Sequence, residues 1–211
     1  MQRDKPGFFS DWGRHGFRAA WLKRFSSLRV EGQLVRYDAL ASWPRDRLEW
    51  LLEASIGEWQ YLTMCWAFEV MVLQSRDLHG CLQFALKSLE SCKETQAVEA
   101  MTWLLRYDDV FPDQYLMSTE HGLWGDYLIG KVYADRAQAL RGTDKEGLKR
   151  NKALAIHFLG RARQQAAAEP ASPEVALDAA TAATIAASAA AAYEAAAYLQ
   201  YKGTRTTAFI E

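Results

Sequence analysis

The apolar residues of this chain recur with helical spacing. Between residues 11 and 28 they are spaced four, four and three apart on one helical face: Phe17, Trp21, Phe25 and Leu28. This spacing predicts an amphipathic helix with a single apolar stripe. Residues 48–73 keep the same spacing for about seven turns, and their second half, residues 59–73, is apolar nearly all round. We expect residues 59–73 to form a buried central helix, because a helix that is apolar on every side needs neighbours on every side.

Capping residues and a proline delimit the helices that follow. Asp77 predicts the start of a helix that carries leucines up to residue 89, and Thr95 predicts the start of the next one. Pro112 disfavours helical geometry at the residue before it and donates no backbone hydrogen bond. We therefore expect this helix to end near Asp108 and residues 108–113 to form a loop.

The C-terminal half predicts three more helices. Residues 118–119, a Ser–Thr pair, offer an N-cap for the first, in which Gly130 leaves room for the close approach of a neighbouring helix. Residues 141–151 are charged and contain two glycines, which is typical of a surface connection. A helix over residues 153–168 follows. The alanine-rich residues 172–197 predict the last helix, because alanine is the strongest helix former.

Strand signals are weak by comparison. Val and Ile are few beside Ala and Leu, and they never alternate with polar residues over the length of a strand. We therefore expect an all-α fold of about seven helices, arranged as a helical bundle or as a short solenoid-like array of antiparallel helix pairs.

The net charge of −1 hides an asymmetry between two parts of the chain. Residues 1–36 carry eight basic and three acidic side chains, so the remainder is acidic. We interpret residues 1–36 as a basic amphipathic N-terminal segment and residues 37–211 as the α-helical domain, the two forming one compact unit. Basic side chains of this segment are the candidates for contact with a partner: Arg14, Arg18, Lys23, Arg24 and Arg29.

Cysteine usage and hydropathy bear on the compartment. The chain has three cysteines at wide spacing and no apolar leader of the secretory type, which predicts buried free thiols in a reducing cytoplasm. The central helix contains Glu69 and is too short to cross a bilayer, and Asp178 and Glu194 interrupt the alanine-rich helix. We therefore expect no membrane association.

Acidic residues supply most candidates for chemistry. Asp108, Asp109 and Asp113 form the densest cluster, but a divalent cation needs more oxygen ligands than this loop offers, so we predict no metal site. Glu69 lies in the most apolar helix of the chain. There a carboxylate must either face solvent along a narrow polar stripe or be paired, and an unpaired buried one would be a functional acid.

One further candidate catalytic group contains a histidine. Glu120, His121 and Asp126 can come together, but none of the four histidines shows a paired metal-binding spacing. Phosphate-loop, dinucleotide-binding and serine-hydrolase motifs are absent from the sequence as well. We predict no cofactor and name no catalytic residue.

Residues 126–162 predict two helices joined by a charged loop. Seven positions on these helices are the basis for a comparison with helical repeats: Leu128, Gly130 and Tyr133 on the first helix, and Lys152, Ala153, Phe158 and Ala162 on the second. At these positions the segment resembles a Sel1-like or tetratricopeptide helix pair. The resemblance implies antiparallel helix hairpins that offer a surface to a protein or peptide. It transfers no site residues, because those repeats have only structural consensus positions.

Aromatic content and the lack of a reactive motif favour binding over catalysis. The chain has eight tryptophans and nine tyrosines, and exposed ones would anchor a partner. We predict a bacterial protein–protein interaction module, such as an adaptor, a chaperone or a toxin-neutralising immunity protein, whose partner is a toxin or a secretion component. The alternative is nucleic-acid binding through the basic and aromatic residues 3–36. A helical enzyme acting through Glu69, His121 or the Asp108 loop ranks third.

Overall fold

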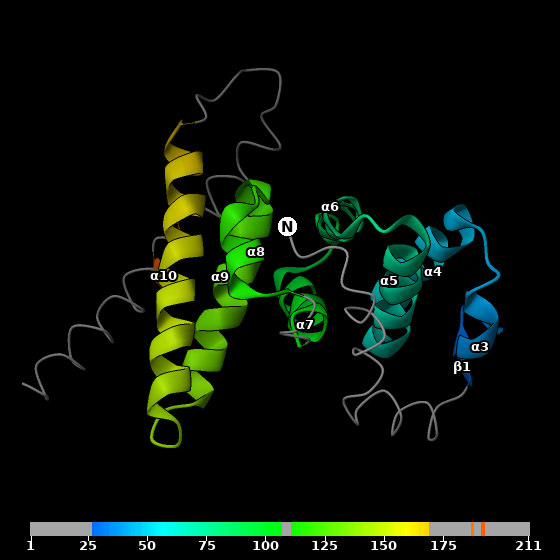
Figure 1. Cartoon of the computed structure of the whole chain (residues 1–211), viewed down its shortest axis with the longest axis horizontal. Helices are drawn as coiled ribbons and strands as arrows, with labels where there is room; N and C mark the ends of the chain where they lie inside the picture. Colours follow the sequence, from blue (N-terminus) through cyan, green and yellow to red (C-terminus); the bar gives the residue numbers. More distant parts are fainter. Residues whose placement is uncertain (1–26, 107–110, 169–186, 188–190, 193–211) are drawn as a thin grey trace, which may run out of the picture. The chain divides into compact units, whose positions relative to one another are not determined.

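The computed structural model describes residues 27–106, 111–168, 187 and 191–192, and these residues form an all-α fold with one short hairpin (Figure 1). The chain divides into two compact units, Met1–Pro112 and Asp113–Glu211. The described part of the first unit contains β1 (Ser27–Val30), β2 (Gln33–Arg36), α3 (Tyr37–Leu40), α4 (Arg45–Gly57), α5 (Tyr61–Ser75), α6 (Leu78–Leu89) and α7 (Glu94–Leu104). The described part of the second unit contains α8 (Asp113–Ser118), α9 (Gly122–Ala139) and α10 (Lys145–Ala168).

The prediction of an all-α fold is confirmed. The described residues form eight helices where about seven were expected for the whole chain. The predicted division between residues 1–36 and 37–211 stays a prediction, because residues 1–26 lie outside the described part of the chain.

The hairpin of β1 and β2 differs from the sequence prediction. The two strands pair in antiparallel register through a two-residue turn at Glu31 and Gly32, whose φ angles are 47° and 76°. This left-handed geometry suits the twist of a tight hairpin. Val30 and Val35 are fully buried, so each strand adds one branched side chain to the core. Of the helix expected over residues 11–28, residues 27 and 28 belong to β1, and residues 11–26 lie outside the described part of the chain.

A break at residues 58–60 divides the long helix predicted over residues 48–73 into α4 and α5. Trp59 adopts a left-handed backbone conformation with φ of 58°, and the Gln60 amide donates to the Ser55 carbonyl oxygen at 2.7 Å. One residue in this region suffices to end a right-handed helix. The chain then turns so that α4 packs against α5. The prediction of one continuous helix is wrong for this reason.

Helix α5 is the buried central helix that the hydropathy pattern predicts. It contacts α3, α4, α6 and α7, and eleven of its fifteen residues are buried. After α5, the carboxylate of Asp77 accepts a hydrogen bond from the Gly80 amide at 2.9 Å, which confirms the predicted cap of α6. Thr95 is not the cap of the next helix, because α7 already begins at Glu94.

The helix boundaries of the second unit differ from the prediction by several residues. Helix α8 begins inside the predicted loop of residues 108–113, and α9 begins at Gly122 rather than at residues 118–119. Helix α10 begins inside the predicted connection of residues 141–151, because the Asp144 carboxylate accepts from the Gly147 amide at 2.9 Å and caps it early. Within the predicted alanine-rich helix the structure describes three residues, all helical: Ala187, Ala191 and Ala192.

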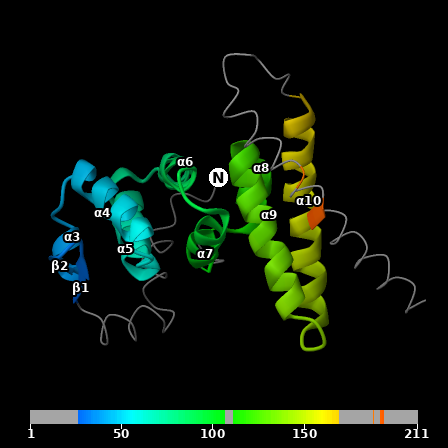
Figure 2. The same ribbon diagram turned by 180° about the vertical axis from the view of Figure 1, so that it is seen from behind.

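Helices α9 and α10 form a closely packed antiparallel pair (Figure 2). A Cβ atom placed on Gly130 would lie 2.7 Å from Leu159 Cγ and 3.0 Å from the Leu159 backbone nitrogen, so the two backbones meet where α9 has no side chain. Near this contact the rings of Tyr133 and Phe158 stack with centroids 6.2 Å apart. The close approach predicted for Gly130 is confirmed.

Candidate functional site

The basic candidates of the N-terminal segment lie almost entirely outside the described residues. Arg14, Arg18, Lys23 and Arg24 are not described. The backbone of Arg29 belongs to β1, where it is paired with Leu34. A partner surface built from these side chains therefore stays a prediction.

Glu69 is buried in α5 and bound by a neutral donor. Glu69 is 7% exposed, and the Tyr37 hydroxyl donates a hydrogen bond to Glu69 Oε1 at 3.0 Å. The ring of Tyr37 also contacts Trp66 edge-on, with centroids 5.3 Å apart. The narrow solvent-facing stripe considered for Glu69 is therefore wrong. The contact with Tyr37 ties α3 to α5, which is a structural role.

A buried thiol lies one turn before Glu69. Burial raises the pKa of Cys65 well above its usual range, and the negative charge of Glu69 raises it further. A thiol held in its protonated form is a poor nucleophile. Cys65 thus acts as a small core residue. The prediction of buried free thiols is confirmed for Cys65 and Cys81, whereas Cys92 is only half-buried.

The aspartate cluster of the 108–113 region is described only at its last member. Asp108 and Asp109 lie outside the described residues, whereas Asp113 is the first residue of α8. Its carboxylate accepts two hydrogen bonds from the guanidinium of Arg150 in α10, at 2.6 and 2.8 Å. This paired geometry ties α8 to α10. Within the described residues, no group of three His, Cys, Asp or Glu side chains is placed to hold a metal ion.

Asp126 is the most deeply buried acid among the described residues of the second unit. It is 0% exposed, and its Oδ2 lies 3.1 Å from Arg161 Nε and accepts from Gln165 Nε2 at 2.8 Å. Its Oδ1 accepts no hydrogen bond within the described residues. Burial raises the pKa of Asp126 to about 6, against the opposing effects of Arg161 and Gln165, and the charge of Glu120 adds to the rise.

The groups around Asp126 join the connection between α8 and α9 to α10. Arg161 donates to the carbonyl oxygens of Met117 at 3.4 Å and Thr119 at 3.0 Å. The imidazole of His121 lies 2.9 Å from the Leu116 carbonyl oxygen, and its ring faces Phe158 with centroids 6.1 Å apart. The charge of Glu120 acts on Asp126, whereas the hydrogen bond of His121 described here is with a backbone carbonyl oxygen, so the convergence of Glu120, His121 and Asp126 stays a prediction.

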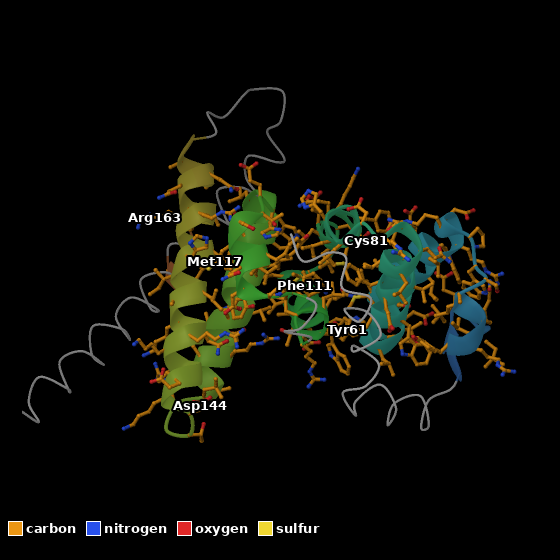
Figure 3. The ribbon with its side chains drawn as sticks, in the orientation of Figure 1. Tyr61, Cys81, Phe111, Met117, Asp144 and Arg163 are labelled. Carbon is orange, nitrogen blue, oxygen red and sulfur yellow. The ribbon has the colours of Figure 1, made fainter. Side chains whose placement is uncertain are left out.

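A row of three aromatic rings lies where α4, α5 and α7 meet in the first unit, with Trp59 exposed, Trp103 half-buried and Tyr61 buried. Trp59 is 50% exposed, and its ring lies 6.2 Å from that of Tyr61. Tyr61 in turn lies 6.5 Å from Trp103, and the guanidinium of Arg106 lies 4.5 Å from the centroid of Trp103. We call these four residues the Trp59 surface. Figure 3 shows the side chain of Tyr61 at the start of α5, away from Cys81 of α6.

Acidic side chains lie beside the Trp59 surface. Glu58 accepts from the Glu31 amide and from Gln60 Nε2, each at 2.7 Å, and Glu99 accepts from the Tyr61 hydroxyl at 3.2 Å. All of these donors are uncharged. Among the described residues, Glu31, Glu58 and Glu99 form no ion pair. Within residues 27–106, no cation is paired with these three carboxylates.

The sequence reasoning missed the Trp59 surface because it placed residue 59 inside a continuous apolar helix. The available signal was the run Gly57–Gln60, in which a glycine and two polar residues surround the tryptophan. Such a run favours an interruption of a helix over its continuation.

Comparison of the chain with models of known protein families, with curated proteins and with solved structures gives no match. In the described part of the chain, every helix is too short or too polar to cross a membrane.

Proposed function

We propose that this chain is a protein-binding module and that the Trp59 surface is part of its contact area. The observation that carries the proposal is the state of Trp59, which is half exposed and held in a left-handed backbone conformation. Such a conformation costs on the order of 1 kcal/mol or more for a residue with a bulky side chain, and strained residues of this kind cluster at functional sites. Tryptophan is also among the residues that contribute most to binding at interfaces.

The described acids support binding rather than catalysis. Glu69 is bound by Tyr37, Asp113 by Arg150 and Asp126 by Arg161. Each of these contacts joins one helix to a neighbouring element, which accounts for the burial or pairing of the acid without a substrate. These contacts therefore provide no support for the hypothesis of a helical enzyme.

The finer classes considered from the sequence remain predictions. An adaptor, a chaperone and a toxin-neutralising immunity protein would all use an exposed aromatic surface. The antiparallel pair of α9 and α10 has the architecture that the Sel1-like or tetratricopeptide resemblance implies, and such pairs serve protein recognition. Nucleic-acid binding depends on residues 3–36, most of which are not described, and the carboxylates beside the Trp59 surface disfavour a phosphate backbone there.

Photo-crosslinking at the surface tests the proposal. The photoreactive amino acid p-benzoylphenylalanine replaces Trp59 in one version of the full chain and Leu73 in another. Leu73 is a matched control, because it is a 39% exposed apolar residue of the same unit, about 20 Å away along the axis of α5. The proposal predicts that one defined protein is crosslinked in native cells from position 59 and not from position 73. Equal crosslinking from both positions, or none from position 59, would contradict it.

A further inference from the structure

We propose that the Trp59 surface binds a cationic segment of another protein, with an arginine or lysine side chain lying on the exposed indole of Trp59 beside Glu58 and Glu99. This inference rests on the proposed function and adds the chemistry of the partner. It follows from the charge around the surface, from the guanidinium groups that lie over two other tryptophans of the unit, and from the exposure of Trp59.

The charge of the surface favours a cation. Among the described residues, Glu58 and Glu99 accept hydrogen bonds from uncharged donors alone, one of which is the backbone amide of Glu31. The Trp59 surface itself holds one positive group, Arg106, which lies over Trp103. A partner that brings positive charge to Glu58 and Glu99 gains electrostatic attraction, and one that brings negative charge is repelled.

Two tryptophans in the described part of the same unit lie under guanidinium groups. The guanidinium of Arg47 lies 3.7 Å from the ring centroid of Trp43, and that of Arg106 lies 4.5 Å from the ring centroid of Trp103. Trp59 is more exposed than either tryptophan, yet no cation from residues 27–106 lies over its ring. A guanidinium or ammonium group from a partner would complete the same arrangement, since such groups are attracted to the face of an indole.

Arginine fits the surface better than lysine. Its planar guanidinium stacks on an aromatic ring while its five N–H groups point outward to acceptors. A guanidinium that lies on the Trp59 ring therefore keeps its N–H groups available for acceptors at the edge of the ring. An ammonium group makes the same charge contact without the stacked plane.

A peptide titration tests the inference with the full chain. The probe is a fluorescein-labelled peptide of alternating glycine and arginine. The control is the same peptide with citrulline in place of arginine, because citrulline keeps the shape of arginine without its charge. Binding is measured by fluorescence anisotropy and by the indole N–H signals in two-dimensional NMR. The inference predicts that the arginine peptide shifts the Trp59 signal and binds at least about fivefold more tightly than the citrulline peptide.

Variants identify the site of peptide binding. Trp59→Ala and the double change Glu58→Gln with Glu99→Gln should each weaken binding of the arginine peptide at least about fivefold. Leu73→Ala should leave that affinity unchanged, and so should Glu49→Gln, whose carboxylate is already paired with Arg45. Equal binding of the two peptides, unchanged binding to Trp59→Ala, or failure of the arginine peptide to bind would overturn the inference. Binding of a single-stranded DNA oligonucleotide that shifts the Trp59 signal would overturn it as well.

The crosslinking experiment separates this inference from the proposed function. The peptide of the partner that is crosslinked at position 59 can be sequenced by mass spectrometry. A segment with arginine or lysine near the crosslink supports both proposals. A defined partner whose crosslinked segment carries no basic residue removes the cationic inference and leaves the protein-binding function in place, and absence of any partner removes the function itself.

Discussion

Replacing Gly130 by alanine should destabilise the second unit, although the same change in an open helix stabilises it. Alanine is favoured over glycine in a helix interior by about 1 kcal/mol. At Gly130 the new methyl group would lie 2.7 Å from Leu159 Cγ and 3.0 Å from the Leu159 backbone nitrogen. Neither atom is the free end of a side chain, so α9 and α10 must move apart. Overpacking of this kind typically costs about 1–3 kcal/mol, and we expect a net loss of about 1 kcal/mol.

Hydrogen exchange of the backbone amides in α9 and α10 measures this loss within the second unit alone. Gly57→Ala is the matched control, because Gly57 ends α4 and nothing lies within 4 Å of the position of its Cβ. It should stabilise the first unit by up to about 1 kcal/mol. In a Leu159→Ala background the contact with the Leu159 side chain is removed and the one with its backbone nitrogen remains, so Gly130→Ala should cost less stability there than in the unaltered chain. If Gly130→Ala stabilises the unaltered chain as Gly57→Ala does, the packing described for α9 and α10 is wrong.

Three further predictions concern the buried acids and Trp59. The pKa of Asp126 in the folded chain, about 6, lies above its ordinary value of 3.8, so the folded state holds the proton more tightly and the stability from this group is lost as pH rises from about 4 to about 6. Urea unfolding should show that the free energy of unfolding falls by about 3 kcal/mol across this range. The fall should disappear in Asp126→Asn and persist in Asp113→Asn. Tyr37→Phe should lower the free energy of unfolding by about 1–3 kcal/mol, because buried Glu69 loses a hydrogen-bond donor. An unchanged free energy of unfolding would refute the stabilising role of this hydrogen bond. Trp59→Gly should unfold at the same or higher urea concentration than Trp59→Ala, because glycine adopts the left-handed conformation without strain; the reverse order would contradict the strain at this position.

Periodicity predicted the helices that are buried on most sides. The apolar run of residues 59–73 identified the central helix, and Asp77 identified the start of α6, because burial and capping leave strong local signals. Gly130 predicted close contact between helices, although the contacting residue, Leu159, depends on how α9 and α10 fit together.

The hairpin and the break at Trp59 could not be predicted in the same way. Each strand has only four residues, too few to show alternation, and the turn of Glu31 and Gly32 contains a single glycine. At Trp59 the apolar spacing continues through the break, so the pattern indicates one helix where the backbone forms two. The partner of Asp126, Arg161, lies 35 residues further along the chain, and only tertiary packing brings the two together.

The affinity of the crosslinked partner for the Trp59→Ala chain is the most direct test of the protein-binding function. Isothermal titration calorimetry of the full chain with that partner compares the unaltered chain, Trp59→Ala and the control Leu73→Ala. A half-exposed tryptophan at the centre of an interface contributes about 2 kcal/mol or more, so we predict that Trp59→Ala weakens binding about 30-fold or more and that Leu73→Ala leaves it unchanged. An affinity of Trp59→Ala within about twofold of the unaltered chain would contradict the account.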